Sequence, residues 1–396
     1  MSNHDSTMND APRHILLVCP QRIGDVLLAT PMARSIKRAW PNAMIDMLVF
    51  AGTEGALEGN TDVRDIIVVP RRAGIGARLG ELTRLWRHYD VALSPIATDR
   101  ARIYCWAAGK QSLGMLLPQA KDRAKALLLN RHLLFDDLDT HTVNMGLALT
   151  SIMRIEPSYE VVPPSVAPEA LTALEQRLSA MDGAAFAVLH PYPKFRYKMW
   201  TPHGWIALAE ALRARGIGVV FTGSAEPAEA AYVAAIAAAL THASPKKVLD
   251  LSGSLSLAET AELIRLAAIY IGPDTAVTHI AAATGTPTVA LFGPSNPVKW
   301  GPWPQQWASV ASPWKRIGSR RQGNVFLVQG TARCTPGVPC MLEGCERHLE
   351  SRSDCLENLA VGTVIEAVDA MLAKPSSATT IMIQKSEPVS ASHGQT

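Results

Sequence analysis

The chain lacks long hydrophobic runs and carries little net charge. None of its apolar stretches approaches the roughly 18 residues that a membrane-spanning helix requires. The polar segment from Met1 to Pro12 also lacks the apolar core of a signal peptide. A formal net charge of +3 is too small to indicate nucleic-acid binding by itself. These absences predict a cytoplasmic protein that has no membrane-spanning segment and no nucleic-acid partner.

The chain also lacks the paired C-x-x-C spacing that is typical of zinc sites. Four of its cysteines lie late in the sequence, at Cys334, Cys340, Cys345 and Cys355. Disulfides are uncommon in the cytoplasm, so we expect reduced thiols in a compact loop and predict no metal or other cofactor. A structural iron or zinc site at these four cysteines is the less favoured alternative.

Basic residues crowd part of the first half, although the net charge is small. They are Arg71, Arg72, Arg78, Arg84, Arg87, Arg100, Arg102, Lys110, Lys121, Arg123, Lys125 and Arg131. This crowding indicates an anionic partner for the first half, such as a phosphorylated acceptor or a membrane surface. For any one of these side chains, a solvated face explains the charge equally well.

The order of strand-like and helical segments predicts the fold class. A length of 396 residues favours two or more domains. Short β-branched runs alternate with helical segments, and the same alternation begins again at Phe186, which predicts parallel sheets with helices on both faces. The Pro-rich passage from Glu156 to Pro168 is the best linker candidate. We therefore predict two doubly wound, Rossmann-like domains that face each other across a cleft.

The predicted domains cover residues 13–160 and 161–374, and residues 1–12 and 375–396 are predicted to be disordered. The first helix is expected to run from Val26 to Ala39 with a kink at Pro31. The last is expected from Thr363 to Lys374, begun by a capping box and packed back across the linker.

One stretch of the second half looks built to hold a phosphorylated ligand. Ile269 to Ile271 is a short buried strand, and Asp274 and Thr275 stand where a helix N-cap belongs. The predicted helix runs from Ala276 to Thr284, and Gly285 ends it in the left-handed conformation. Backbone N–H groups point out of a helix start at the carboxyl end of a parallel strand, so an anion should bind there.

Asp25, at the mouth of the first strand, has two possible roles. It could cap a helix N-terminus, which requires no chemistry. Alternatively, its carboxylate could face the cleft and accept a proton from an incoming hydroxyl. A helix N-terminus lowers the pKa of a carboxylate and weakens it as a base. The residue pattern alone therefore favours the cap.

Further candidates lie in the second half. Lys194, Arg196 and Lys198 could belong to a solvated loop, but three cations beside a predicted anion site favour phosphate binding. Glu226 follows a strand end, where carboxylates often bind ribose hydroxyls, although a charge in a first helical turn is the stronger explanation. His279 lies one turn into the predicted anion-binding helix, facing the expected ligand.

Taken together, these stretches resemble glycosyltransferase family 9, the heptosyltransferases that build the inner core of lipopolysaccharide. The stretches are Arg22-Ile-Gly-Asp-Val26 with Thr30-Pro31, Lys198-Met-Trp200, Thr222-Gly-Ser224 with Glu226, Asp274-Thr-Ala-Val-Thr-His-Ile-Ala281 and Phe292-Gly-Pro-Ser-Asn-Pro297. They occur in the family's order and extend from the first strand towards the final helix. The combination is far more specific than any single motif.

The resemblance implies a GT-B fold with an acceptor-binding N-terminal domain and a donor-binding C-terminal domain. It implies inverting, metal-independent transfer of heptose from ADP-heptose to a Kdo or heptose hydroxyl of an anionic lipopolysaccharide core acceptor. It also implies work at the inner face of the inner membrane, in peripheral contact with its surface. The alternative is a related transferase for another nucleotide sugar, or for a different envelope glycan or protein acceptor.

The resemblance also implies roles for single residues. Asp25 matches the general base, which raises it above the cap interpretation, and Lys198 matches the lysine that neutralises the donor diphosphate. Glu226 matches the ribose position, Asp274 the sugar contact, and Thr275 with the helix start the phosphate site. The substrate-binding residues implied are Arg22, Gly24, Lys194, Lys198, Gly223, Glu226, Asp274, Thr275, Ala276 and His279, the last in a supporting role.

Two features depart from the family's pattern. The loop from Tyr192 to Tyr197 is more basic and aromatic than in many members and resembles the branch that adds later core heptoses, which leaves the acceptor open. The late cysteines resemble clusters found in several members, including an iron-binding branch that modifies proteins. This chain lacks the large extra N-terminal domain of that branch.

Overall fold

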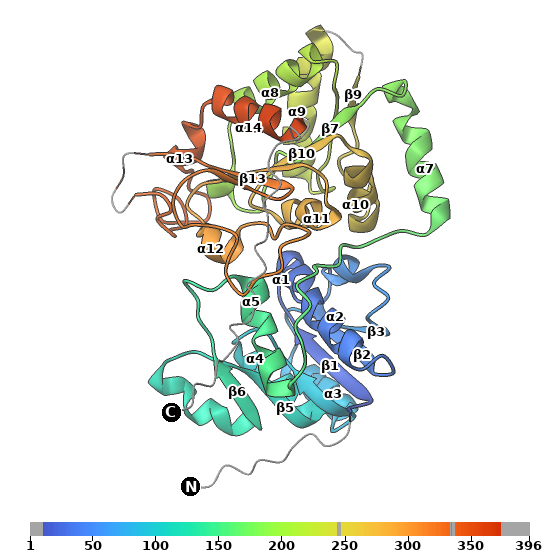
Figure 1. Ribbon diagram of the computed structural model, residues 1–396, viewed down its shortest axis with the longest axis vertical. Coiled ribbons are helices and arrows are strands. Elements are labelled where there is room, and N and C mark those ends of the chain that lie inside the picture. Colours follow the sequence, from blue (N-terminus) through green and yellow to red (C-terminus); the bar gives the residue numbers. More distant parts are fainter. Residues whose placement is uncertain (1–10, 244–246, 333, 335–336, 374–396) are drawn as a thin grey trace, which may run out of the picture.

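The computed structural model describes residues 11–243, 247–332, 334 and 337–373. Figure 1 shows two α/β lobes stacked along the long axis, the N-terminal lobe in blue to teal and the C-terminal lobe in green to red. Of the residues predicted to be disordered, 1–10 and 375–396 lie outside the described residues, whereas residues 11 and 12 are described and Pro12 is buried. No helix in the described ranges is both long enough and apolar enough to cross a membrane.

The N-terminal lobe is built on a six-stranded parallel sheet in the order β3-β2-β1-β4-β5-β6. Its strands are β1 (His14–Cys19), β2 (Met44–Phe50), β3 (Asp65–Val69), β4 (Tyr89–Leu93), β5 (Gly109–Leu116) and β6 (Arg131–Leu134). Successive residues of β1 point to opposite faces, with Leu17 in one apolar cluster and Leu16 in the other. Helices therefore cover both faces, as the continuous apolar strands predict.

Helices and 3₁₀ turns connect the strands of this lobe. The helices are α1 (Ile23–Leu28), α2 (Thr30–Ala39), α3 (Ile75–Leu85), α4 (Asp99–Ala108), α5 (Thr142–Leu147) and α6 (Leu149–Met153). The 3₁₀ turns are η1 (Glu54–Leu57), η2 (Ala120–Asp122) and η3 (Ala124–Leu128).

The single kinked helix predicted from Val26 to Ala39 is wrong, because the chain forms two helices that meet at Ala29. Pro31 is the second residue of α2, where its missing N–H costs no helical hydrogen bond. The Thr30 hydroxyl instead donates to the Leu27 carbonyl at 2.7 Å. The proline therefore starts a new helix.

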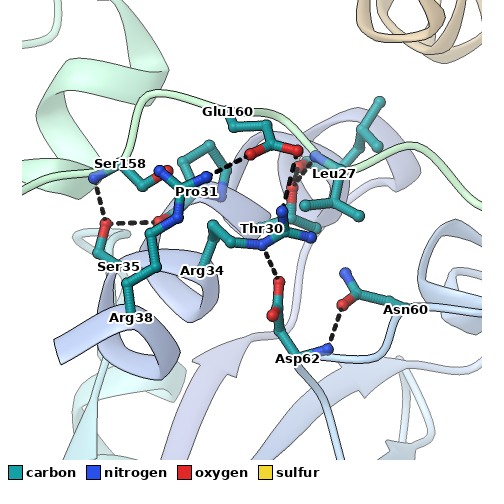
Figure 2. Close-up of polar contacts among 11 residues, drawn as sticks. Leu27, Thr30, Pro31, Arg34, Ser35, Arg38, Asn60, Asp62, Ser158 and Glu160 are labelled. Atoms are coloured by element: carbon teal, nitrogen blue, oxygen red, sulfur yellow. Dashed lines mark hydrogen bonds and ion pairs between the residues drawn. The ribbon is translucent and has the colours of Figure 1, made fainter. Parts of the chain in front are cut away.

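The predicted linker lies against the N-terminal lobe. Between α6 and α7 the chain has no helix or strand from residue 155 to 167. The Ser158 amide donates to the Ser35 hydroxyl of α2 at 2.8 Å. Figure 2 shows Arg34 and Arg38 directed at Glu160, at 2.9 and 2.7 Å. These contacts fix the path of the chain as it leaves the first lobe.

The C-terminal lobe repeats the same strand order. Its sheet runs β12-β13-β11-β10-β7-β8-β9, and only β12 at one edge is antiparallel among the described strands. The strands are β7 (Phe186–Leu189), β8 (Gly218–Phe221), β9 (Val248–Asp250), β10 (Ile269–Pro273), β11 (Thr288–Phe292), β12 (Arg320–Gln322) and β13 (Val325–Gln329). Without β12, the order from β9 to β13 is that of the first sheet. Both are therefore doubly wound, Rossmann-like sheets.

The helices of this lobe begin largely where their capping residues predict. They are α7 (Pro168–Leu178), α8 (Pro202–Ala214), α9 (Pro227–Ala243), α10 (Leu257–Leu266), α11 (Ala276–Thr284), α12 (Pro297–Trp300), α13 (Asp354–Glu357) and α14 (Val361–Leu372), with the 3₁₀ turns η4 (Ser179–Met181) and η5 (Arg196–Lys198). The side chains of Thr201 and Ser256 cap α8 and α10. Thr275 caps α11, and Gly285 ends it at a φ of 85°.

Two predictions for the last helix are wrong. α14 begins after Ala360, two residues before the proposed capping residue Thr363, and Ala360 makes no side-chain cap. The helix does not return across the linker but packs against α8, β11 and β13 of its own lobe. Its apolar face, which includes Val364 and Val368, joins the core of the C-terminal lobe.

Candidate active site

The two lobes meet at the carboxyl edges of their sheets. In each sheet the strand order reverses beside the first strand, between β1 and β4 and between β7 and β10. Ligands bind doubly wound sheets at such switch points. The segments that follow β1, β7 and β10 carry Asp25, Lys198 and Asp274 respectively. We call these three residues, with Thr275, His279 and Lys299, the interlobe site.

Asp25 is not the N-cap of α1 but its third residue, so the predicted position is wrong, although its carboxylate takes part in a capping box at the start of the helix. Arg22 holds the cap position, and its amide donates to the Asp25 Oδ2 at 3.3 Å. Burial raises the pKa of the Asp25 carboxyl, while the Arg22 amide and the charges of Arg22, Lys299 and Lys198 oppose that rise. A half-buried carboxylate with a raised pKa is better suited to accept a proton than an exposed helix cap.

The starts of α1 and α11 are in contact between the lobes (Figure 1). A methyl group at Gly24 would lie 3.6 Å from the His279 ring and 3.9 Å from the Ala276 Cα. The predicted base and the predicted anion-binding helix therefore meet across the lobe boundary. Thr275 and Ala276, at the start of α11, both remain partly accessible.

Lys198 and Asp274 form the polar centre of the C-terminal side. The Lys198 Nζ donates to the Asp274 Oδ2 at 2.5 Å, and the two side chains are 18% and 7% exposed. Burial opposes ionisation of Asp274, but Lys198, the Ser295 side chain and His279 outweigh it and hold the carboxyl pKa below its usual value. An ionised carboxylate and a lysine are thus present where the donor is predicted.

His279 lies on α11 behind this pair. Burial lowers its pKa to about 4, so the ring is neutral at pH 7. The ring is 6% exposed, and its Nδ1 is buried without a hydrogen-bond partner in the described residues. Buried polar atoms normally find partners. A hydroxyl of a bound ligand could supply the missing partner.

The basic loop after β7 is organised around Phe195. Three cations lie over its ring, Arg22 at 4.9 Å, Lys198 at 5.8 Å and Lys194 at 5.9 Å, and Tyr197 stacks on it at 5.4 Å. Arg22 belongs to the opposite lobe, so the aromatic ring joins cations from both sides. Sequence reasoning noted the aromatic residues of this loop but missed this role for Phe195.

Gly223 and Glu226 lie apart from this cluster, beyond β8. A Cβ at Gly223 would come within 2.9 Å of the Glu229 Oε1. Glu226 is exposed beside the start of α9, and within the described residues no hydrogen bond or ion pair joins its side chain to Lys198 or Asp274. A cavity of about 340 Å³ lies nearby, bounded by Tyr192, Lys194 and Tyr232 among others.

Comparison with known proteins identifies the family. Residues 88–326, more than half of the chain, match glycosyltransferase family 9 (heptosyltransferase). The chain belongs to glycosyltransferase family 9. Lipopolysaccharide heptosyltransferase 3 of Escherichia coli (strain K12) is 27% identical to this family 9 chain over 295 residues, which cover 71% of it and 82% of the relative.

Solved structures confirm the predicted GT-B fold of this family 9 protein. The E. coli ADP-heptose lps heptosyltransferase II superposes with a TM-score of 0.69 at 21% identity, over 91% of this chain and 98% of that one. E. coli heptosyltransferase WaaC, solved with ADP, superposes with a TM-score of 0.64 at 18% identity, over 90% and 99%.

Lys299 is a residue of the interlobe site that sequence reasoning missed. It lies on α12, is 8% exposed, and is paired with Asp137 of the N-terminal lobe. Its Nζ lies 4.8 Å from the Trp300 ring centre and 5.2 Å from that of Phe135. Burial lowers its pKa to about 8, against the opposing charges of Asp25 and Asp136. Its position just beyond the Phe292–Pro297 motif was the available signal.

The late cysteines of the family 9 chain are free thiols. Burial, with the neighbouring Cys340, Cys345 and Cys334, raises the pKa of Cys355 to about 12. Within the described residues, no group of three or more His, Cys, Asp or Glu side chains is arranged to hold a metal ion.

Proposed function

We propose that this protein is an inverting heptosyltransferase that transfers heptose from ADP-heptose to an anionic lipopolysaccharide core acceptor. The observation that carries the proposal is the contact between the starts of α1 and α11, which brings Asp25 close to the Lys198–Asp274 pair. The names of its relatives support the substrate class: one is a lipopolysaccharide heptosyltransferase, and another was solved with ADP.

The proposed reaction is one in-line displacement at the anomeric carbon. The acceptor oxygen forms the new bond to that carbon as Asp25 takes its proton. The bond from the anomeric carbon to the leaving oxygen breaks, and its electron pair departs with ADP. Attack from the side opposite the leaving group inverts the configuration. Proton transfer to a placed base contributes about 10²–10⁴-fold in rate.

Lys198 and the start of α11 are proposed to meet the diphosphate as its negative charge develops. Fixed positive groups placed where charge develops stabilise the transition state strongly. We propose metal-independent chemistry because these groups themselves supply the positive charge. Asp274 and His279 then contact the sugar, and the unpartnered His279 Nδ1 is matched to one of its hydroxyls.

The remaining predicted contacts complete the proposal. Glu226 would bind the ribose, with the cavity beside Tyr192 and Tyr232 receiving part of the nucleoside. Arg22, Gly24, Lys194, Gly223 and Ala276 would line the substrates. We place the acceptor domain at residues 13–160 and the donor domain at 161–374, and we place the protein peripherally at the cytoplasmic face of the inner membrane.

Product analysis tests this function. Purified protein is given ADP-heptose and a panel of truncated core acceptors that end in Kdo or in heptose, and the products are identified by mass. We expect one acceptor to gain a single heptose, with equimolar ADP released. Parallel reactions with UDP-sugars serve as the control. Transfer from a UDP-sugar and none from ADP-heptose would contradict the proposed donor.

A further inference from the structure

The helix α3 of the N-terminal lobe exposes an apolar stripe. Ile75, Leu79, Leu82 and Trp86 are spaced by four, three and four residues, which places them on one side of a helix and its C-cap. Leu82 is half-buried against the lobe core. Ile75, Leu79 and Trp86 are 88%, 61% and 51% exposed. A stripe that normally faces a core is here largely open to the surroundings.

The neighbouring helix α4 widens this apolar surface. Trp106 packs edge-on against Trp86 with ring centres 5.1 Å apart, and Trp106 and Ile103 are both exposed. Single exposed apolar residues need no explanation, whereas a contiguous group of them marks an interaction site. We call Ile75, Leu79, Trp86, Ile103 and Trp106 the α3 patch.

Positive charge surrounds the α3 patch. The segment from Arg71 to Arg87 contains five arginines and one glutamate. The glutamate, Glu81, accepts a hydrogen bond from the Tyr104 hydroxyl. Arg72, Arg78 and Arg84 are exposed. Tryptophans beside arginines on a part-apolar helix are typical of segments that lie on a membrane surface.

The segment that leads into α3 lies near the donor-side loop. Arg71 immediately precedes α3, and its guanidinium lies 5.1 Å from the Phe50 ring centre, which Arg100 also covers at 4.7 Å. Arg100 donates to the Arg71 carbonyl at 2.8 Å and so braces this turn. Burial and the charges of Arg22 and Arg71 lower the pKa of Lys194, which places Arg71 close to the loop of the donor side.

We propose that the α3 patch and its arginines dock this protein on an anionic lipid bilayer. The partner is identified by complementarity, because an apolar centre ringed by positive charge matches acyl chains beneath anionic headgroups. A second copy of this chain would bring the same arginines together, and their repulsion disfavours that occupant. This inference rests on the proposed function, because the purpose of docking would be to present a lipid-borne acceptor to Asp25.

Vesicle flotation tests the docking without requiring turnover. Full-length protein is mixed with vesicles of phosphatidylethanolamine and phosphatidylglycerol in equal parts, or of phosphatidylcholine alone. We expect binding to the anionic vesicles, weak binding to the neutral ones, and loss of binding in high salt. The double variant Ile75→Glu with Leu79→Glu should reduce the bound fraction at least tenfold, and Arg78→Glu with Arg84→Glu should reduce it similarly.

The matched control is Val310→Glu with Ile317→Glu, which alters two apolar residues of the C-terminal lobe that are 81% and 72% exposed. This control should bind as the unchanged protein does. Equal loss in the control, or no binding of the unchanged protein to anionic vesicles, would overturn the proposal. A third result would also overturn it: light scattering shows a dimer that Ile75→Glu with Leu79→Glu dissociates, and the unchanged protein does not bind vesicles. The patch would then be an interface between two copies of the chain.

Activity separates this inference from the proposed function. With a short soluble acceptor, the variant Ile75→Glu with Leu79→Glu should transfer heptose as fast as the unchanged protein. With the acceptor embedded in anionic vesicles, the same variant should lose most of its transfer rate. If the unchanged protein binds vesicles but transfers no heptose, the proposed function fails and the docking stands. If the variant and the unchanged protein transfer heptose equally well to soluble and to vesicle-embedded acceptors, the docking proposal fails and the proposed function stands.

Discussion

The two lobes share one strand order and differ in what their loops carry at the same topological position. After its first strand, the N-terminal lobe presents a carboxylate, Asp25, held by the amide of Arg22. After its first strand, the C-terminal lobe presents the cation Lys198, paired with Asp274 from beyond β10. The sheets therefore supply position, and the chemistry comes from short loops placed on them. In the proposed mechanism one lobe takes a proton and the other holds an anion.

The largest expected effect is at Asp25. Asp25→Asn keeps the shape of the side chain but removes its ability to accept a proton, so kcat should fall by about 10²–10⁴-fold. The affinity for ADP, measured by calorimetry, should stay nearly unchanged because the predicted nucleotide contacts lie on the other lobe. Equal loss of turnover and ADP binding would mean that Asp25 has a structural role. It would also mean that proton transfer and nucleotide binding are not separated between the two lobes.

The converse experiment alters the C-terminal lobe. Lys198→Met removes the cation predicted to bind the diphosphate, so the Kd for ADP should rise roughly tenfold to a hundredfold, as for loss of a charged hydrogen bond. Lys194→Met is the comparison variant. Because the Lys194 side chain is exposed, its loss should raise the Kd for ADP by a smaller factor. If Lys198→Met left ADP affinity intact while reducing kcat, the anion site would have to lie elsewhere.

The sequence predicts the C-terminal lobe better than the N-terminal one, for a physical reason. Capping residues are local, so Thr275 and Gly285 could be assigned to the ends of α11 without knowledge of the fold. Asp25 could not be assigned in the same way, because the burial that raises its pKa, and the charges of Lys299 and Lys198 that oppose the rise, depend on tertiary contacts that the local sequence does not reveal. The break at Ala29 was missed because a Pro inside a helical pattern can either kink a helix or begin a new one.

Contacts between distant segments were beyond prediction. Lys299 was missed because its neighbours Asp25 and Asp137 belong to the other lobe and lie far away in sequence. The return of the final helix was wrongly expected because an apolar face shows that a helix packs, but does not show against which lobe. Family resemblance could name the base and two of the cations that act on it, Arg22 and Lys198, but it did not reveal the third, Lys299.

Lys299 lies at the boundary between the lobes and can test whether one lobe controls the protonation of a residue on the other. Its positive charge favours the ionised form of Asp25, against the burial that raises the pKa of that carboxyl. Lys299→Met should therefore raise the pKa of Asp25 further and move the acid limb of the kcat/KM profile upward by about one pH unit. Lys299→Arg should retain most of the normal profile.

The control for this prediction is Arg316→Met. Arg316 pairs with Asp139, in the same N-terminal segment as Asp137, so its loss also removes an ion pair between the lobes. A merely structural effect of Lys299 would lower kcat/KM in both variants without moving the acid limb. A shift confined to Lys299→Met would show that the donor lobe sets the protonation state of the base on the acceptor lobe.

The smallest expected effect concerns how the two facing helices end. α11 ends at Gly285 with a φ of 85°, whereas α1 ends at Ala29 in the right-handed region and continues into α2. Gly285→Ala forces a side chain into the left-handed region and should lower the free energy of unfolding by about 1 kcal/mol. Gly362→Ala is the matched control, because Gly362 lies within α14 and a Cβ there meets no neighbouring atom within 4 Å. That change should instead stabilise by roughly 0.5–1 kcal/mol, since alanine is the better helix former. Urea unfolding of both variants measures the difference, and equal shifts of one sign would show that the end of α11 does not depend on its glycine.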